Sequence, residues 1–315
     1  MKSWTTSGAL ILAIATLASS FPFDVKANVA CEALFGSEDA ALWMQPYERI
    51  GYSHPLFPVV EGIVRMRYDM RVQGLDAVAV HGRRGILFIM NHPSFSDPAI
   101  VTVALKDFQV APVMGAHVVA MPVIGKAIGY GTNKVDAIYV PRRKPGESKE
   151  EHVAHITAII AEAVARLDRG ENVVLWPAGE IMKDSQSHLG QKRMLHDIVK
   201  ELPDVRVVLG RTTGLWGSSL GFGATGKLDL GRGGLKAAEA TVSKLVTGPL
   251  TPRRKVSIEF IEPMDLPRDS GRTELNQYVE TWFNAVEQPK VLVPYNPIEN
   301  AVKGTRVIEP ESPAK

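Results

Sequence analysis

Six short runs of apolar and β-branched residues recur along the chain, each bounded by glycine, proline or charged residues. They are Ile86–Met90, Val110–Met114, Ala137–Val140, Val173–Trp176, Val205–Leu209 and Val256–Ile261. Apolar runs of this length that lack polar alternation are typical of strands buried on both faces. The sequence therefore predicts a mixed, largely buried β-sheet.

Two longer segments are predicted to be helical. In Lys149–Arg169 apolar residues recur three or four positions apart, the preceding Ser148 forms a capping-box pattern with Glu151, and Gly170 follows the last turn. The segment 272–285 is predicted as a closing helix. Strands that alternate with helices indicate an α/β fold in which helices flank the mixed sheet.

The two ends of the chain depart from this pattern. Thr5–Phe23 carries no charge, and Gly8–Ala18 within it is strongly apolar. This length is short for a spanning helix and fits the apolar region of a signal peptide, with a membrane anchor as the alternative. Residues 296–315 contain three prolines and little apolar periodicity, which predicts a disordered tail. We expect a signal-like or anchor segment over residues 1–26, one domain over 27–295, and the tail.

Composition restricts the class of protein. The chain has 315 residues, of which 45% are hydrophobic and 22% charged, as in ordinary globular proteins and unlike disordered, collagen-like or coiled-coil chains. A net charge of +2 is too small to indicate a nucleic-acid partner, and we expect none. The single cysteine, Cys31, excludes an intrachain disulfide and a cysteine-rich metal site, and we expect no metal.

A candidate catalytic segment follows the first apolar run. Residues 91–98 are Asn-His-Pro-Ser-Phe-Ser-Asp-Pro. Loops that leave the carboxyl end of a strand are where α/β proteins usually hold reactive side chains. Asp97 followed by Pro98 is expected to cap a helix. With four residues between them, the turn can bring the Asp97 carboxylate to one imidazole nitrogen of His92, which leaves the other nitrogen as a general base.

The order and spacing of this and three later segments resemble the phospholipid-synthesis acyltransferase family, whose members acylate 1-acylglycerol-3-phosphate, glycerol-3-phosphate or lysophospholipids. Residues 91–98 resemble its first, His-x4-Asp block, in which the histidine deprotonates the acceptor hydroxyl and the aspartate orients it. Residues 129–143 resemble the second block, whose arginine binds acceptor phosphate. Residues 175–180 stand where the third block, Phe-Pro-Glu-Gly-Thr-Arg, is found, and 207–211 occupy the place of the fourth. The resemblance spans roughly residues 47–283 and implies a glycerolipid acyltransferase-like fold.

The resemblance also implies a set of substrate-binding residues. The candidates, with the two arginines of the second block first as phosphate ligands, are Arg142, Arg143, Gly179, Glu180, Lys183 and Arg211. The third block departs from the family pattern. Ala178 stands at the family's glutamate, Glu180 at its threonine and Ile181 at its arginine. Together with residues 211–219, the block also looks like acyltransferase modules fused to acyl-activating enzymes, which would suggest a lysophospholipid acceptor.

The reaction that the resemblance implies needs no cofactor. The donor, acyl-CoA or acyl carrier protein, is an activated thioester, so transfer requires a deprotonated hydroxyl held against the carbonyl and stabilisation of the oxyanion. The expected acceptor is a membrane lysophospholipid or glycerol phosphate, with 1-acylglycerol-3-phosphate first. Because both donors are cytosolic, we expect an anchored protein whose site faces the cytoplasm, while the signal-like N-terminus leaves export as the alternative.

A serine esterase or lipase is the alternative from another enzyme class, with a lipid-binding module as a third. Residues 217–221 match the Gly-x-Ser-x-Gly pattern around Ser219. Hydrolases with that pattern have serine, acid and histidine in this order along the chain, whereas every histidine here lies at or before His196. The order of residues therefore favours the acyltransferase.

Overall fold

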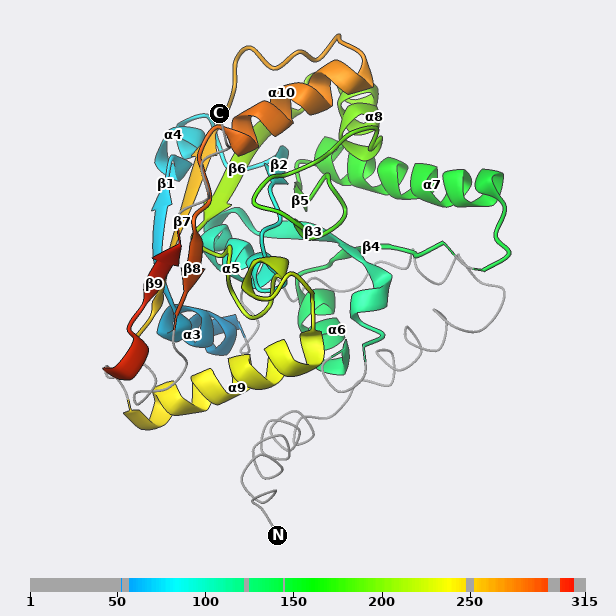
Figure 1. Cartoon of the computed structure of the whole chain (residues 1–315). Coiled ribbons are helices and arrows are strands. Elements are labelled where there is room, and N and C mark those ends of the chain that lie inside the picture. The colour runs from blue at the N-terminus through cyan, green and yellow to red at the C-terminus, as the bar shows by residue number, and fades with distance from the viewer. Residues whose placement is uncertain are drawn as a thin grey trace, which may run out of the picture.

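A mixed seven-stranded sheet forms the centre of the molecule (Figure 1). The computed structural model describes residues 52, 57–121, 125–143, 145–247, 252–293 and 301–308. The strands of the sheet, in spatial order, are β1 (Tyr68–Gln73), β7 (Arg254–Ile261), β6 (Arg206–Thr213), β2 (Ile86–Met90), β5 (Asn172–Leu175), β3 (Val110–Gly115) and β4 (Ile138–Val140). Strands β6, β2, β5, β3 and β4 are parallel to one another. β7 is antiparallel to β6 and parallel to β1.

Helices cover both faces of this sheet. The helices of the structure include α3 (Phe57–Arg67), α4 (Leu75–Val80), α5 (Asp97–Ala104), α6 (Gly125–Lys134), α7 (Lys149–Asp168), α8 (Met194–Glu201), α9 (Leu230–Thr247) and α10 (Arg272–Asn284). One hydrophobic core joins the sheet to α7, α8 and α10. A second core on the opposite face joins it to α3, α4 and α5.

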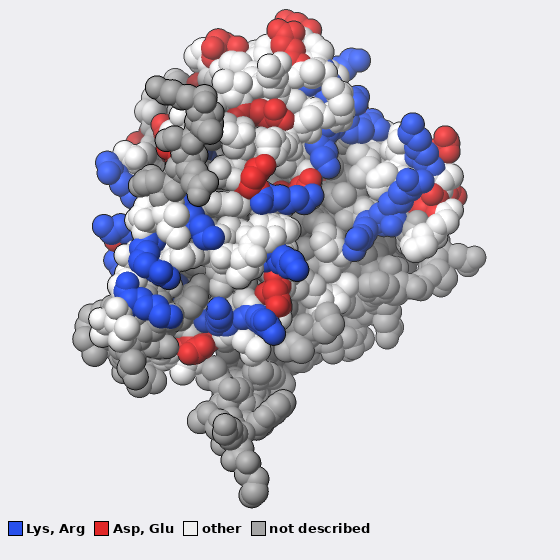
Figure 2. All heavy atoms as spheres, in the orientation of Figure 1, with Lys and Arg blue, Asp and Glu red and all other residues white. Residues whose placement is uncertain are grey.

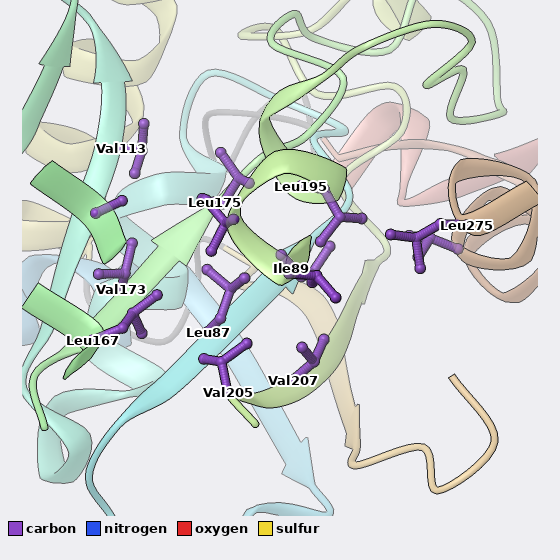
Figure 3. Close-up of a cluster of buried hydrophobic side chains, with 14 of the residues drawn as sticks. Leu87, Ile89, Val113, Leu167, Val173, Leu175, Leu195, Val205, Val207 and Leu275 are labelled. Carbon is purple, nitrogen blue, oxygen red and sulfur yellow. The ribbon is translucent and has the colours of Figure 1, made fainter. Parts of the chain in front are cut away.

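Strand β2 contributes to both cores, because its side chains alternate between the two faces of the sheet. Leu87 and Ile89 belong to the core under α7, α8 and α10, part of which is drawn in Figure 3. Ile86, Phe88 and Met90 belong to the other core. All of these side chains are at most 1% exposed, so the strand that leads into the candidate catalytic loop is fixed from both sides.

The structure confirms the predicted α/β class and the main elements. All six apolar runs contain strands of the sheet. Helix α7 has the predicted capping box, in which Ser148 Oγ accepts from the Glu151 amide and the Glu151 carboxylate accepts from the Ser148 amide. The chain leaves this helix through Gly170, whose φ of 80° suits glycine. Helix α10 forms where the closing helix is expected.

The sequence did not predict three of the strands. Strand β1 contains Asp69, Arg71 and Gln73 and is largely exposed, so it lacks the apolar run that identifies a buried strand. Strands β8 (Lys290–Leu292) and β9 (Arg306–Ile308) form a separate antiparallel pair. Because β9 lies within residues 296–315, the structure differs there from the predicted disordered tail.

The apolar N-terminal segment Gly8–Ala18 lies outside the described residues, as does the proposed boundary between residues 26 and 27. Its role as a signal or an anchor stays a prediction. Among the helices that the structure describes, none combines the length and the apolar character that crossing a membrane requires.

Candidate active site

The sheet topology brings the loops that follow five strands to one edge. Because β6, β2, β5, β3 and β4 are parallel, their carboxyl ends lie on the same side of the sheet. The segments that follow them begin at residues 214, 91, 176, 116 and 141. These segments contain most of the candidate residues, and in open α/β sheets this edge is where ligands bind.

His92 and Asp97 face each other at the centre of this edge. His92 Nδ1 lies 3.5 Å from Asp97 Oδ2. The Asp97 side chain is fully buried, whereas the His92 side chain is 16% exposed. Since Nδ1 is buried against the carboxylate, Nε2 is the imidazole nitrogen left to act on a substrate. The turn thus brings the His92 imidazole and the Asp97 carboxylate together, as their spacing predicts.

Asp97 does not cap helix α5, in contrast to the sequence prediction. The helix begins at Asp97, and Ser96 precedes it at the N-cap position without a side-chain hydrogen bond to the helix. The Asp97 carboxylate is instead turned into the protein, where Oδ2 accepts a hydrogen bond of 2.7 Å from Trp176 Nε1. Pro98 still lies in the first helical turn, as expected.

Trp176 is a site residue that the sequence did not predict. It directly follows β5, which pairs in parallel with β2, and its side chain is 6% exposed. Besides its hydrogen bond to Asp97, its ring lies beside that of His92, with centroids 5.6 Å apart and planes inclined by 45°. The available signal was a large aromatic residue at the carboxyl end of a strand, but only the strand order places it beside His92.

The backbone around His92 is tied to two neighbouring segments. The buried Asn91 side chain donates to the Thr212 carbonyl at 3.0 Å and accepts from the Thr212 amide at 2.7 Å, which links the loop to the end of β6. On the other side, the Met182 amide donates to the His92 carbonyl at 2.9 Å. The candidate catalytic loop is therefore attached to the end of β6 and to the segment that follows β5.

A cluster of hydroxyl groups fixes the middle of the same loop. Ser94 is fully buried, and its Oγ lies 2.9 Å from Ser218 Oγ and donates to the Leu220 carbonyl at 3.2 Å. The Phe95 amide donates to the same carbonyl at 2.8 Å. These bonds hold the turn between His92 and Asp97 in one conformation, so the geometry of the pair is set before substrate binds.

The two arginines of the second block have different environments. The Arg143 guanidinium donates to the Glu147 carbonyl in its own loop, at 3.1 and 3.3 Å. Arg142 is exposed, and among the described residues it has no hydrogen-bond or ion-pair partner. It lies near His117, where partial desolvation of the imidazole and the positive charge of Arg142 lower the pKa of His117. Of the two arginines, Arg142 has the guanidinium available for an anion.

Positive charge alone does not identify an anion site. Figure 2 shows Lys and Arg side chains in several separate groups on one face, with acidic and uncharged surface between them. The position of Arg142 is what distinguishes it, because it follows β4 at the same edge of the sheet that holds His92.

The third block forms a turn beside the candidate catalytic loop. The Gly179 amide donates to the Trp176 carbonyl at 2.9 Å, and Gly179 has a φ of 67°, a conformation that glycine adopts readily. Glu180 and Lys183 form an exposed ion pair of 2.6 Å. The turn therefore positions Trp176, while Glu180 and Lys183 lie at the surface.

Arg211 is engaged within the protein. Its side chain is 6% exposed, Nη2 lies 2.6 Å from Glu259 Oε2, and the guanidinium stacks at 4.5 Å from the Trp282 ring centroid while donating to the Trp282 carbonyl. Along β6 it follows Val207 and Leu209, which belong to the core beneath α10. The structure therefore places Arg211 in contacts that join β6 to β7 and α10.

Ser219, the serine of the esterase alternative, lies several residues beyond the end of β6. Its Oγ donates to the Gly233 carbonyl at 3.5 Å. A nucleophile elbow places the serine in a strained turn directly after a strand. Ser219 has neither that position nor a positive φ.

Comparisons with known proteins relate this chain to acyltransferases. A family model described as Acyltransferase matches residues 69–209. The chain is similar in structure to the 1-acyl-sn-glycerophosphate (LPA) acyltransferase PlsC from Thermotoga maritima, with a TM-score of 0.50 and 15% sequence identity over 89% of this chain and 93% of that one. No curated protein matches. The family match extends from β1 to within β6 and includes His92, Asp97, Trp176 and Arg142.

Proposed function

We propose that this protein is an O-acyltransferase that transfers a fatty acyl group from a thioester to a glycerolipid hydroxyl. The proposal starts from the match of residues 69–209 to the Acyltransferase family model. The observation that carries the proposal is the His92–Asp97 pair at the carboxyl edge of the sheet, held by hydrogen bonds to neighbouring segments. A thioester is already activated, so the protein has to supply a base, an aligned acceptor and stabilisation of the developing charge.

In the proposed reaction, His92 Nε2 removes the proton of the acceptor hydroxyl. The acceptor oxygen forms a bond to the thioester carbonyl carbon, and the carbon–sulfur bond then breaks. The thiolate leaves and takes up the proton from His92, which returns the imidazole to its starting form. Asp97 holds Nδ1 and stabilises the imidazolium that exists between the two proton transfers.

The proposed acceptor carries a phosphate, with 1-acylglycerol-3-phosphate as the leading candidate. Arg142 supports this choice because an exposed guanidinium can bind a phosphate through two parallel hydrogen bonds. The similar structure is that of an enzyme described as an LPA acyltransferase. We propose Arg142 as the main phosphate ligand, with Lys183 near the end of β5 as a second cation.

The donor in this proposal is acyl-CoA or acyl carrier protein, and no further cofactor takes part. Both donors are cytosolic, which supports a protein that works at a membrane from the cytoplasmic side. The apolar N-terminal segment is the proposed anchor.

The test is thiol release from palmitoyl-CoA by the purified full-length protein. Release is measured without acceptor and with lysophosphatidate, glycerol-3-phosphate or lysophosphatidylethanolamine, and compared between wild type and His92→Ala. We expect release that depends on lysophosphatidate and is lost in His92→Ala. Release that needs no acceptor, survives His92→Ala and is lost in Ser219→Ala would show a hydrolase instead.

A further inference from the structure

The Asp97 carboxylate is fully buried, yet it has few polar neighbours. Oδ2 accepts the hydrogen bond from Trp176 Nε1 at 2.7 Å and faces His92 Nδ1 at 3.5 Å. Oδ1 is also buried and accepts no hydrogen bond from the described residues. Within that part of the chain, the indole N–H is therefore the one hydrogen-bond donor that holds the carboxylate.

A buried carboxylate requires such a donor. Burial without hydrogen bonds penalises the charged form and leaves the side chain free to rotate. The indole N–H is neutral, so it stabilises the carboxylate without introducing a positive charge that would compete with a protonated His92. It also leaves Oδ2 within reach of Nδ1, because an oxygen of a carboxylate can accept more than one hydrogen bond.

The backbone holds the indole firmly in this position. Trp176 follows the last paired residue of β5, where Leu175 lies opposite Ile89 of β2. Because the two strands are adjacent and parallel, Trp176 and His92 lie side by side at their ends. The turn after Trp176 closes through the Gly179 amide, and the Met182 amide then binds the His92 carbonyl. The indole, the imidazole and the carboxylate thus belong to one connected unit.

At Trp176 the chain differs from the third block that it resembles. The third block that these residues resemble begins with phenylalanine, which has no N–H to donate. Tryptophan keeps the large ring that packs beside His92 and adds a donor at the distance of Asp97 Oδ2.

We propose that Trp176 is a positioning residue for the acyl transfer, acting through Asp97. Its N–H fixes the Asp97 carboxylate in the rotamer that faces His92, so that Nδ1 is held and Nε2 points to the acceptor. This inference rests on the proposed role of His92 as base. Because Trp176 acts only through Asp97, its removal should lower kcat and leave the binding of both substrates nearly unchanged.

The experiment is a double-mutant cycle with Trp176→Phe and Asp97→Asn, using the acceptor-dependent assay. Loss of a hydrogen bond to a charged group predicts that Trp176→Phe lowers kcat about 10- to 100-fold, with each KM within about threefold of wild type. In the Asp97→Asn background the same change should alter kcat by less than about threefold. The matched control is Trp282→Phe, the same substitution in α10, which should retain wild-type kcat.

A second readout does not depend on activity. The sequence has five tryptophans, and their indole N–H signals can be observed in the 15N-labelled protein. The signal that Trp176→Phe removes is that of Trp176, and we expect Asp97→Asn to displace this signal more than any other indole signal. This readout needs no enzymatic activity of the Trp176→Phe variant. If Asp97→Asn displaces no indole signal, there is no bond in solution and the proposal fails.

The kinetic outcomes separate the two proposals. If Trp176→Phe retains kcat, or lowers it equally in both backgrounds, Trp176 does not act through Asp97 and this inference is wrong. If His92→Ala retains transfer, the proposed mechanism is wrong whatever Trp176 does. Loss of activity in His92→Ala together with non-additive effects of the Trp176 and Asp97 variants supports both.

Discussion

The loop around His92 and the loop around Arg142 lie at the same edge of the sheet but are built differently. The His92 loop follows the central strand β2. It is bonded to the segment after β5 through Trp176 and Met182, and to the end of β6 through Thr212. The Arg142 loop follows the edge strand β4, and its arginines are exposed. The Arg143 guanidinium donates to a carbonyl four residues along the same loop.

The difference fits the two roles proposed for these loops. A general base must be aligned with the reacting atoms to a fraction of an ångström, which requires a loop fixed by several neighbours. A cation that binds phosphate works over a broader range of geometries, since Coulomb attraction falls slowly with distance. We therefore expect changes in the first loop to act on kcat and changes in the second to act on KM.

The largest expected effect is that of Asp97→Asn. The amide keeps the size of the carboxylate, and its oxygen can still accept from Trp176. Because the same oxygen, Oδ2, also faces His92 Nδ1, the amide oxygen takes its place at both contacts but carries no charge. It therefore holds the indole N–H and stabilises the imidazolium much less than the carboxylate does. We expect kcat to fall about 10²- to 10⁴-fold with little change in KM, as measured by initial rates of acceptor-dependent thiol release.

A change mainly in the KM for the acceptor would contradict the role of Asp97. The variant should remain folded, because the substitution is nearly isosteric. Circular dichroism and a thermal melt serve as the control for folding.

The next effect concerns the acceptor phosphate. Arg142→Ala should raise the KM for lysophosphatidate about 10-fold or more, since a charge-assisted hydrogen bond contributes about 1.5–3 kcal/mol, while kcat changes little. Arg143→Ala is the matched control from the adjacent position, because its guanidinium already binds the Glu147 carbonyl. The measurement is acceptor titration at saturating acyl-CoA. Equal increases of this KM in the two variants would show that Arg142 is not the main phosphate ligand of the two.

A smaller effect is expected for a change at Arg211, and it concerns the free energy of unfolding. Arg211→Met removes the ion pair to Glu259 and the stacking on Trp282, but the Glu259 side chain is 47% exposed and stays solvated. We expect a loss of about 1–2 kcal/mol in the free energy of unfolding, measured by urea denaturation, and an unchanged KM for the acceptor. A rise in that KM at unchanged stability would show instead that Arg211 binds substrate.

The local pattern of the sequence was sufficient to predict that His92 and Asp97 lie together. His92 and Asp97 lie within one turn after a buried strand, so their proximity depends on four intervening residues and not on the rest of the fold. Helix α7 was predictable for the same reason, since its capping box and terminal glycine are adjacent in sequence.

Contacts between segments that are distant in the chain could not be predicted from the sequence. Trp176 reaches Asp97 only because β5 is the spatial neighbour of β2, and no periodicity encodes the strand order. Arg211 was predicted as a candidate phosphate ligand. Its actual partners, Glu259 and Trp282, are far away in the chain and could not be identified from the sequence. Its environment is set by the antiparallel pairing of β6 with β7 and by the packing of α10.

The smallest expected effect tests whether His117 and Arg142 are neighbours in solution. Partial desolvation and the charge of Arg142 lower the pKa of His117 in the folded protein. The unfolded chain then binds the proton more tightly, so the protein loses stability as the pH falls below about 6.5, the ordinary value for histidine. His117→Gln should reduce the loss between pH 7.5 and pH 5.5, as measured by urea denaturation. Both side chains are exposed, so salt screens the repulsion between them. The part of the pH-dependent stability loss that is due to Arg142 should therefore be smaller in 1 M salt and in Arg142→Ala. A pH dependence of stability that neither variant alters would mean that His117 and Arg142 are not neighbours in solution.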